Sequence, residues 1–163
     1  CSSDLAIIRA FMASDTKRDL VIVTNHAGNP YFDALRQATG FEQDTRIKFV
    51  GTVYDKALLM AIRQQAFAYL HGHAVGGTNP GLLEAMGATD LNLVFDVSFN
   101  RNVALSSALY WQQETLTDVM TQAEKMSLSE IEALAVAARG IIAEKYTWSG
   151  IVAQYERLFL NEG

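Results

Sequence analysis

The sequence predicts an α/β fold in which helices flank a parallel sheet, because short apolar runs alternate with helix-like stretches. Near-continuous apolar runs of this length are typical of strands that are buried on both faces. Strands that alternate with helical segments indicate βαβ units and a parallel sheet. The expected strands, of which the last is the weakest, span residues 20–23, 47–51, 67–72, 92–97 and 108–111.

Helical periodicity and capping residues mark the segments between the strands. Apolar residues over 5–11 predict an opening helix, and those over 58–66 predict another with Asp55 as its N-cap. The chain has only two prolines, and they occur in Asn29-Pro30 and Asn79-Pro80, each after a strand and a loop. Asn is a strong N-cap and Pro suits the first helical position, so each pair predicts a helix start at the carboxyl edge of the sheet.

The chain becomes all-helical after residue 112. Ser127 and Glu130 have the spacing of a capping box before an apolar run. A last helix is expected from about Thr147, with a junction or kink at residues 145–147.

Composition limits the class of protein. The chain has 163 residues, which is the length of a single domain, and a composition of 50% hydrophobic and 19% charged residues argues against disorder. Its net charge of −5 argues against a nucleic-acid partner. One cysteine and no long apolar run indicate a soluble, cytoplasmic protein. The opening Cys1-Ser2-Ser3-Asp4 has no signal-peptide pattern and suggests a piece cut from a longer chain.

The loop before Asn79-Pro80 is the strongest candidate for chemistry. It contains Gly76, Gly77 and Thr78, and glycines let backbone N–H groups approach an anion beside a helix N-terminus. The loop could hold a phosphate or a cluster of sugar hydroxyls. Glycines in such loops are more often turn-makers, so that interpretation stays open.

Two kinds of titratable residue flank this loop. Glu84 could accept hydrogen bonds from ribose hydroxyls, or it could face water and favour the helix dipole. His71 and His73 point the same way in a strand, which would suit a metal. No further ligand lies near them in sequence, so satisfied polar residues are favoured and no metal is expected. No catalytic residue can be assigned.

Two segments of the sequence resemble a known family. VGGTNPGLLEAM (75–86), followed by NLVFDVSFNRNV (92–103), resembles the C-terminal domain of retaining glycosyltransferases of the GT-B type. Within them, it is most similar to the rhamnosyltransferase-like group that builds bacterial surface polysaccharides. The likeness runs through essentially the whole chain, including residues 20–35, 46–72 and 146–159. It implies a Rossmann-like donor-binding domain.

The resemblance also implies a donor site. Many family members have two glutamates separated by seven residues; Glu84 matches the second, which holds the ribose hydroxyls, and the first falls on Gly76. The rhamnosyltransferase-like group shares this glycine. The other implied donor-binding residues are Tyr54 beside the base, His73 of the His-Gly-His segment, and the backbone donors Gly77, Thr78 and Asn79.

Three departures from the family pattern stand out. The Lys and Arg that precede the first helix in the family fall near Ser2 and before Cys1, and the Glu of the Phe-Asn-Arg-Glu-Val segment is Asn102 here. The strand expected before the opening helix is missing. That strand is central in a doubly wound sheet, so its loss should leave a gap or force an unusual pairing.

The resemblance implies a function for the intact enzyme. It would transfer a sugar, either rhamnose or a UDP-linked hexose or N-acetylhexosamine, with retention and without a metal or cofactor. The acceptor, a polysaccharide or a lipid-linked oligosaccharide of O-antigen or capsule synthesis, would bind a missing N-terminal domain. The intact enzyme could associate peripherally with the inner face of the membrane, and residues 1–163 alone should be inactive. The alternative is a non-catalytic nucleotide-binding or interaction module, which Gly76 and Asn102 favour slightly.

Overall fold

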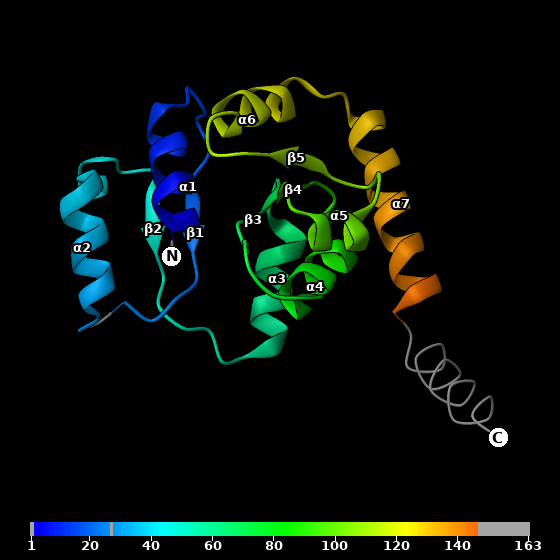
Figure 1. The fold of residues 1–163 in the computed structure, drawn as a ribbon, viewed down its shortest axis with the longest axis horizontal. Coiled ribbons are helices and arrows are strands. Elements are labelled where there is room, and N and C mark those ends of the chain that lie inside the picture. Colours follow the sequence, from blue (N-terminus) through cyan, green and yellow to red (C-terminus); the bar gives the residue numbers. More distant parts are fainter. Residues whose placement is uncertain (1, 27, 147–163) are drawn as a thin grey trace.

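The computed structural model of the chain describes residues 2–26 and 28–146 and has the expected α/β architecture (Figure 1). Its strands are β1 (Leu20–Ile22), β2 (Ile47–Phe49), β3 (Tyr69–His71), β4 (Asn92–Phe95) and β5 (Leu109–Trp111). Its helices are α1 (Ser2–Ala13), α2 (Pro30–Thr39), the short 3-10 helix η1 (Phe41–Gln43), α3 (Lys56–Gln65), α4 (Pro80–Ala88), α5 (Ser98–Ala104), α6 (Leu116–Lys125) and α7 (Leu128–Lys145).

All strand pairs are parallel, as predicted, and the strands form two separate sheets, which agrees with the gap that the missing strand was expected to leave. β1 pairs with β2 in a two-stranded sheet, and β4 lies between β3 and β5 in a three-stranded sheet. In register, Leu20 lies opposite Ile47 in the first sheet, and His71 lies opposite Val94 in the second. Within the described residues no strand joins the two sheets, which stand side by side in Figure 1.

The predicted helix caps are confirmed by their hydrogen bonds. The Asn29 side chain accepts from the N–H of Tyr31 at 2.9 Å, with Pro30 at the first helical position. Asp55 accepts from the N–H of Ala57 at 2.8 Å. Such bonds satisfy backbone donors that have no partner inside the helix, so each helix begins at a defined residue.

The predicted capping box is also present, and it begins α7. The Ser127 side chain accepts from the N–H of Glu130, whose carboxylate accepts from the N–H of Ser127 at 2.8 Å. The hydrogen bonds to Ser127 hold the pKa of the Glu130 carboxyl below its usual range. α7 ends at Lys145, where the junction was expected. The helix predicted from Thr147 lies outside the described residues.

The core has two parts, one on each side of the strands. On one side α1, α2 and α6 lie in contact, and Ile8, Phe11, Leu93 and Trp111 are buried together there. On the other side α4 packs against α7, and a smaller cluster is buried, consisting of Leu82, Met86, Val94, Val103, Ala104, Ala108 and Ala138. Alternate residues of β4, such as Leu93 and Val94, therefore face opposite clusters, as in a sheet covered on both faces.

The prediction that every strand is buried on both faces is wrong for β1 and β2. Val21 of β1 is 46% exposed, and Lys48 of β2 is exposed as well. α3, which follows β2, has no buried residue, although Leu58 and Met60 are apolar. Because the sheet is interrupted, β1, β2 and α3 are not covered on both sides as they would be in a continuous sheet.

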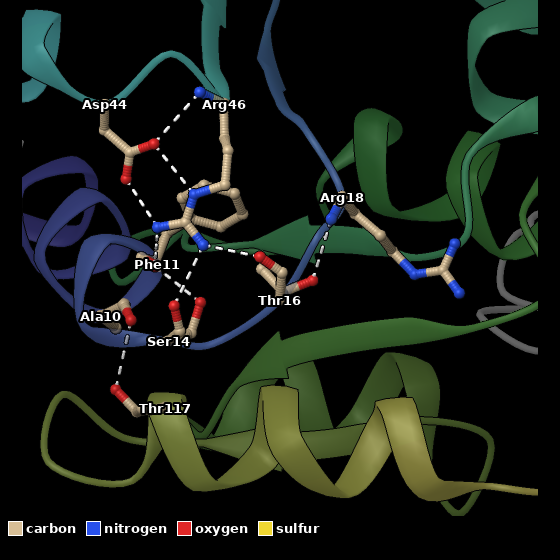
Figure 2. Close-up of polar contacts among 8 residues, drawn as sticks. All are labelled: Ala10, Phe11, Ser14, Thr16, Arg18, Asp44, Arg46 and Thr117. Carbon is tan, nitrogen blue, oxygen red and sulfur yellow. Dashed lines mark hydrogen bonds and ion pairs between the residues drawn. The ribbon is translucent and has the colours of Figure 1, made fainter.

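Arg46 anchors the end of α1 (Figure 2). Its guanidinium donates to the carbonyl oxygens of Ser14 at 3.0 Å, Thr16 at 2.7 Å and Phe11 at 3.4 Å. It also pairs with Asp44 at 2.6 Å, and this bond holds the pKa of the Asp44 carboxyl below its usual range. Arg46 thus binds the carbonyl groups of Ser14 and Thr16 in the segment that follows α1, and it links that segment to the Phe11 carbonyl in the last turn of the helix.

No helix in the described ranges, 2–26 and 28–146, is both long and apolar enough to cross a bilayer.

We expect Arg46→Ala to lower the free energy of unfolding by about 2–3 kcal/mol at pH 7, because it removes several hydrogen bonds to a charged donor. Part of the effect depends on pH. Asp44 has a lowered pKa in the folded protein, so its contribution is present above about pH 4 and is lost as the pH falls through that lowered value. Urea unfolding at pH 7 and pH 3 measures both effects.

Arg36→Ala is the matched control for Arg46→Ala. Arg36 lies 3.2 Å from Asp33 and 3.6 Å from Glu42, and its side chain is 43% exposed. Exposed pairs of this kind contribute less than about 1 kcal/mol. Equal losses for the two variants would contradict an anchoring role for Arg46.

Candidate functional site

The loop between β3 and α4 ends in a capped helix start. The Asn79 side chain accepts from the N–H of Gly81 at 2.8 Å, and Pro80 opens α4, as predicted. A Cβ atom at Gly81 would lie 3.0 Å from Asn79 Oδ1 and would press on the capping oxygen. The side-chain oxygen of Asn79 is therefore committed to the helix cap.

The backbone of this loop presents free donors. The N–H groups of Gly77, Thr78 and Asn79 donate to no acceptor within the described residues. Gly77 and Thr78 are exposed, and Asn79 is partly buried. Successive backbone N–H groups ahead of a helix N-terminus form a favourable environment for an anion.

Gly76 shapes the loop. Its φ of +118° lies where residues with a Cβ atom are strained. A Cβ there would be 3.8 Å from Nε2 of His73, so the loop folds back towards that ring. The predicted donor residues His73 and Gly76 are therefore neighbours in space.

Glu84 points towards α3. Its Oε2 lies 2.5 Å from Nη1 of Arg63, and its side chain is 51% exposed whereas that of Arg63 is 13% exposed. Both interpretations of Glu84 stay open, because the carboxylate has a fixed partner in Arg63 and about half of the side chain is exposed to solvent. Burial raises the pKa of the neighbouring Tyr69.

The two histidines are near neighbours at the carboxyl end of β3. The ring centroids of His71 and His73 are 6.1 Å apart. His71 is 4% exposed, and burial lowers its pKa to about 4, helped by the charge of His73 and opposed by a hydrogen bond with Asn100. Nε2 of His71 has no hydrogen-bond partner among residues 2–26 and 28–146. His71 is thus a neutral, buried ring.

A metal site is not evident in the described part of the chain. No three side chains of His, Cys, Asp or Glu lie close enough there to share an ion.

Sequence reasoning missed the structural role of Asn100. Its Nδ2 donates to the carbonyl of His73 at 3.0 Å and to that of Phe95 at 2.9 Å. This buried amide therefore ties the carboxyl end of β3 to that of β4, directly beneath the loop. The Phe-Asn-Arg stretch that contains Asn100 carried the resemblance and was the available signal.

The remaining predicted residue, Tyr54, stands apart. It lies between β2 and α3, is 89% exposed, and makes no hydrogen bond or ring contact within the described residues. Arg63 was also missed, because nothing in the sequence links it to Glu84, which is 21 positions away. The structure therefore brings together His73, the Gly76–Asn79 loop and Glu84, but does not join Tyr54 to them.

Comparisons with known proteins define the class by fold. No protein-family model matches the sequence, and no curated protein does. Solved structures do match, and they are retaining glycosyltransferases of the GT-B type. The described chain has the Rossmann-like fold of a GT-B domain.

Trehalose-6-phosphate synthases are among the matching structures. The structure of OtsA is 15% identical with a TM-score of 0.68, over 98% of this chain and 39% of its own. The enzyme from Burkholderia vietnamiensis is 14% identical with a TM-score of 0.69, over 96% of this chain and 40% of its own. The chain thus spans about two-fifths of the length of these enzymes. Another trehalose-6-phosphate synthase was studied for glycosyl transfer with retention; it is 16% identical with a TM-score of 0.68 over 86% of this chain and 38% of its own.

We expect the buried His71 to make stability depend on pH. Its pKa is about 4 in the folded protein, against about 6.5 in the unfolded chain, so the unfolded chain binds more protons between these values. The contribution of neutral His71 to stability is fully present above about pH 6.5 and is lost as the pH falls towards 4. Urea unfolding from pH 7 to pH 4.5 measures this slope.

His71→Gln should flatten that slope, whereas His26→Gln, at a partly exposed ring, should leave it unchanged. An NMR titration of the ring Cε1–H signals should show His71 still neutral at pH 5.5. A charged His71 at that pH would contradict the prediction.

Proposed function

We propose that this chain binds the nucleotide-sugar donor of a retaining glycosyltransferase. The observation that carries the proposal is the row of free backbone N–H groups at Gly77, Thr78 and Asn79, ahead of a capped helix that also holds Glu84. A diphosphate is the anion that this row suits, and a carboxylate in the following helix suits ribose hydroxyls. The likeness to glycosyltransferase structures supports the same conclusion.

Each predicted residue has a role in this proposal. The N–H groups of Gly77, Thr78 and Asn79 bind the diphosphate, and Glu84 accepts from the ribose hydroxyls. His73 and Gly76 border the donor sugar, and the exposed Tyr54 contacts the base. No metal or cofactor takes part.

The finer assignments rest on the resemblance. The donor sugar is rhamnose or a UDP-linked hexose or N-acetylhexosamine, and the acceptor is a polysaccharide or lipid-linked oligosaccharide of O-antigen or capsule synthesis. The acceptor binds an N-terminal domain, so residues 1–163 alone are inactive. The intact enzyme acts in the cytoplasm, with peripheral association at the inner membrane face.

We also propose that one further parallel strand fills the interruption between β1 and β3 in the intact enzyme. Within the described residues β1 pairs only with β2, and β3 pairs only with β4. α1 starts beside the carboxyl end of β3, because a Cβ at Gly72 would lie 2.9 Å from Ile7 and 3.0 Å from Ser3. α1 then leads into β1, as a crossover helix does in a βαβ unit.

We expect Glu84→Gln to weaken the binding of a nucleoside diphosphate about tenfold, because it replaces a charged acceptor by a neutral one. Calorimetric titration of the chain with UDP and with dTDP measures this. Glu132→Gln, on the exposed surface of α7, is the matched control and should bind as the unchanged chain does.

The same titration tests the alternatives. A well-folded chain that binds neither nucleotide would contradict the donor site. Binding without any transfer of sugar by the intact enzyme would favour the non-catalytic module.

We expect an N-terminal extension of the chain by the protein's own preceding residues to protect the amides of β1 and β3 from hydrogen exchange. A strand between them would satisfy backbone groups at both edges. Exchange measured by mass spectrometry on both chains tests this, with β5 as the internal control. Unchanged exchange at β1 and β3 would contradict the proposed strand.

A further inference from the structure

The guanidinium of Arg63 lies where α3, β3 and α4 meet. Its Nη1 is 2.5 Å from Oε2 of Glu84, and its side chain is only 13% exposed. A Cβ at Gly81 would lie 4.0 Å from Nη2 of Arg63 and 3.6 Å from the hydroxyl of Tyr69. The charge of Arg63 also acts on Tyr69, so these groups share one environment.

The two oxygens of Glu84 have different surroundings. Oε2 is paired with Arg63, while Oε1 has no partner within the described residues. The side chain is 51% exposed, so the unpaired oxygen is open to a ligand. A carboxylate fixed at one oxygen presents the other in one orientation and loses less rotamer entropy when it accepts a hydroxyl.

The pair differs from an ordinary surface ion pair. Two exposed long side chains gain little from pairing, because ordering them costs as much as the attraction provides. Here the guanidinium is largely withdrawn from solvent, and the carbonyl oxygen of Arg63 accepts from the hydroxyl of Thr89 at 2.9 Å, beyond the end of α4. Contacts at both its backbone and its side chain therefore join α3 to α4, and the orientation of Glu84 depends on α3.

We propose that Arg63 is a positioning residue for ribose recognition: it holds the Glu84 carboxylate directed at the hydroxyls of the bound nucleotide. This inference rests on the proposed donor site. Arg63 itself does not touch the nucleotide. Its effect is therefore confined to the part of the affinity that comes from the ribose hydroxyls.

The test compares two probes that differ only in those hydroxyls, UDP and 2′,3′-dideoxy-UDP. The ribose selectivity is the dissociation constant of 2′,3′-dideoxy-UDP divided by that of UDP. Arg63→Gln should lower this ratio about three- to tenfold, and Arg63→Lys, which keeps the charge, should lower it less. The matched control is Arg139→Gln on α7. It breaks an exposed ion pair with Asp90 and should leave the ratio unchanged.

Each outcome decides between roles. If Arg63→Gln weakens both probes equally, Arg63 serves the fold alone and the inference is overturned. It is also overturned if Arg63→Gln binds UDP more tightly, because Arg63 would then compete with the ribose. If Arg63→Gln keeps the selectivity while Glu84→Gln loses it, the donor site stands without Arg63.

The proposed function has its own point of failure. If the unchanged, well-folded chain binds neither probe, the donor site fails and this inference fails with it. Near-ultraviolet circular dichroism verifies that each variant is folded, and Arg63→Lys keeps the test decisive if Arg63→Gln unfolds.

Discussion

Helix α1 is the element on which the rest of the molecule depends, because it packs against two sheets that share no hydrogen bond within the part of the chain that the structure describes. Ile8 and Phe11 are buried in the same cluster as Leu20 of the first sheet and Leu93 of the second. Burying a side chain of this size contributes about 1.5–3 kcal/mol, so the apolar face of one helix supplies much of what joins the halves. Arg46 complements this packing with directional bonds at the end of α1 (Figure 2).

The candidate site belongs to the three-stranded half. Leu82 and Met86 bury one side of α4 against the core, and this burial fixes which side of the helix faces outward. The opposite side carries Glu84, which is consequently left at the surface. Asn100 connects the strands beneath, so the loop with its free N–H groups stands on rigid elements although it is itself exposed. Rigid support of this kind reduces the ordering cost of binding.

Local interactions were the predictable part of this structure. The caps at Asn29, Asn79 and Asp55 are side chain to backbone bonds within three residues, so sequence patterns contain them almost completely. The division of the sheet was expected only from the resemblance, through the strand that is missing before α1. The exposure of Val21 depends on what lies beside its strand, which no local pattern specifies. The ion pair between Arg63 and Glu84 is likewise not specified by any local pattern. The loop was therefore predictable, whereas Arg63, the partner of the Glu84 carboxylate, was not.

The backbone at Gly76 has an evolutionary consequence. The resembling family often has a glutamate at this position, but a φ of +118° is a conformation that side-chain-bearing residues rarely adopt. A single codon change to glutamate would thus place the acid on a backbone that resists it, beside the ring of His73. A glutamate at position 76 would therefore require a different backbone conformation of the loop.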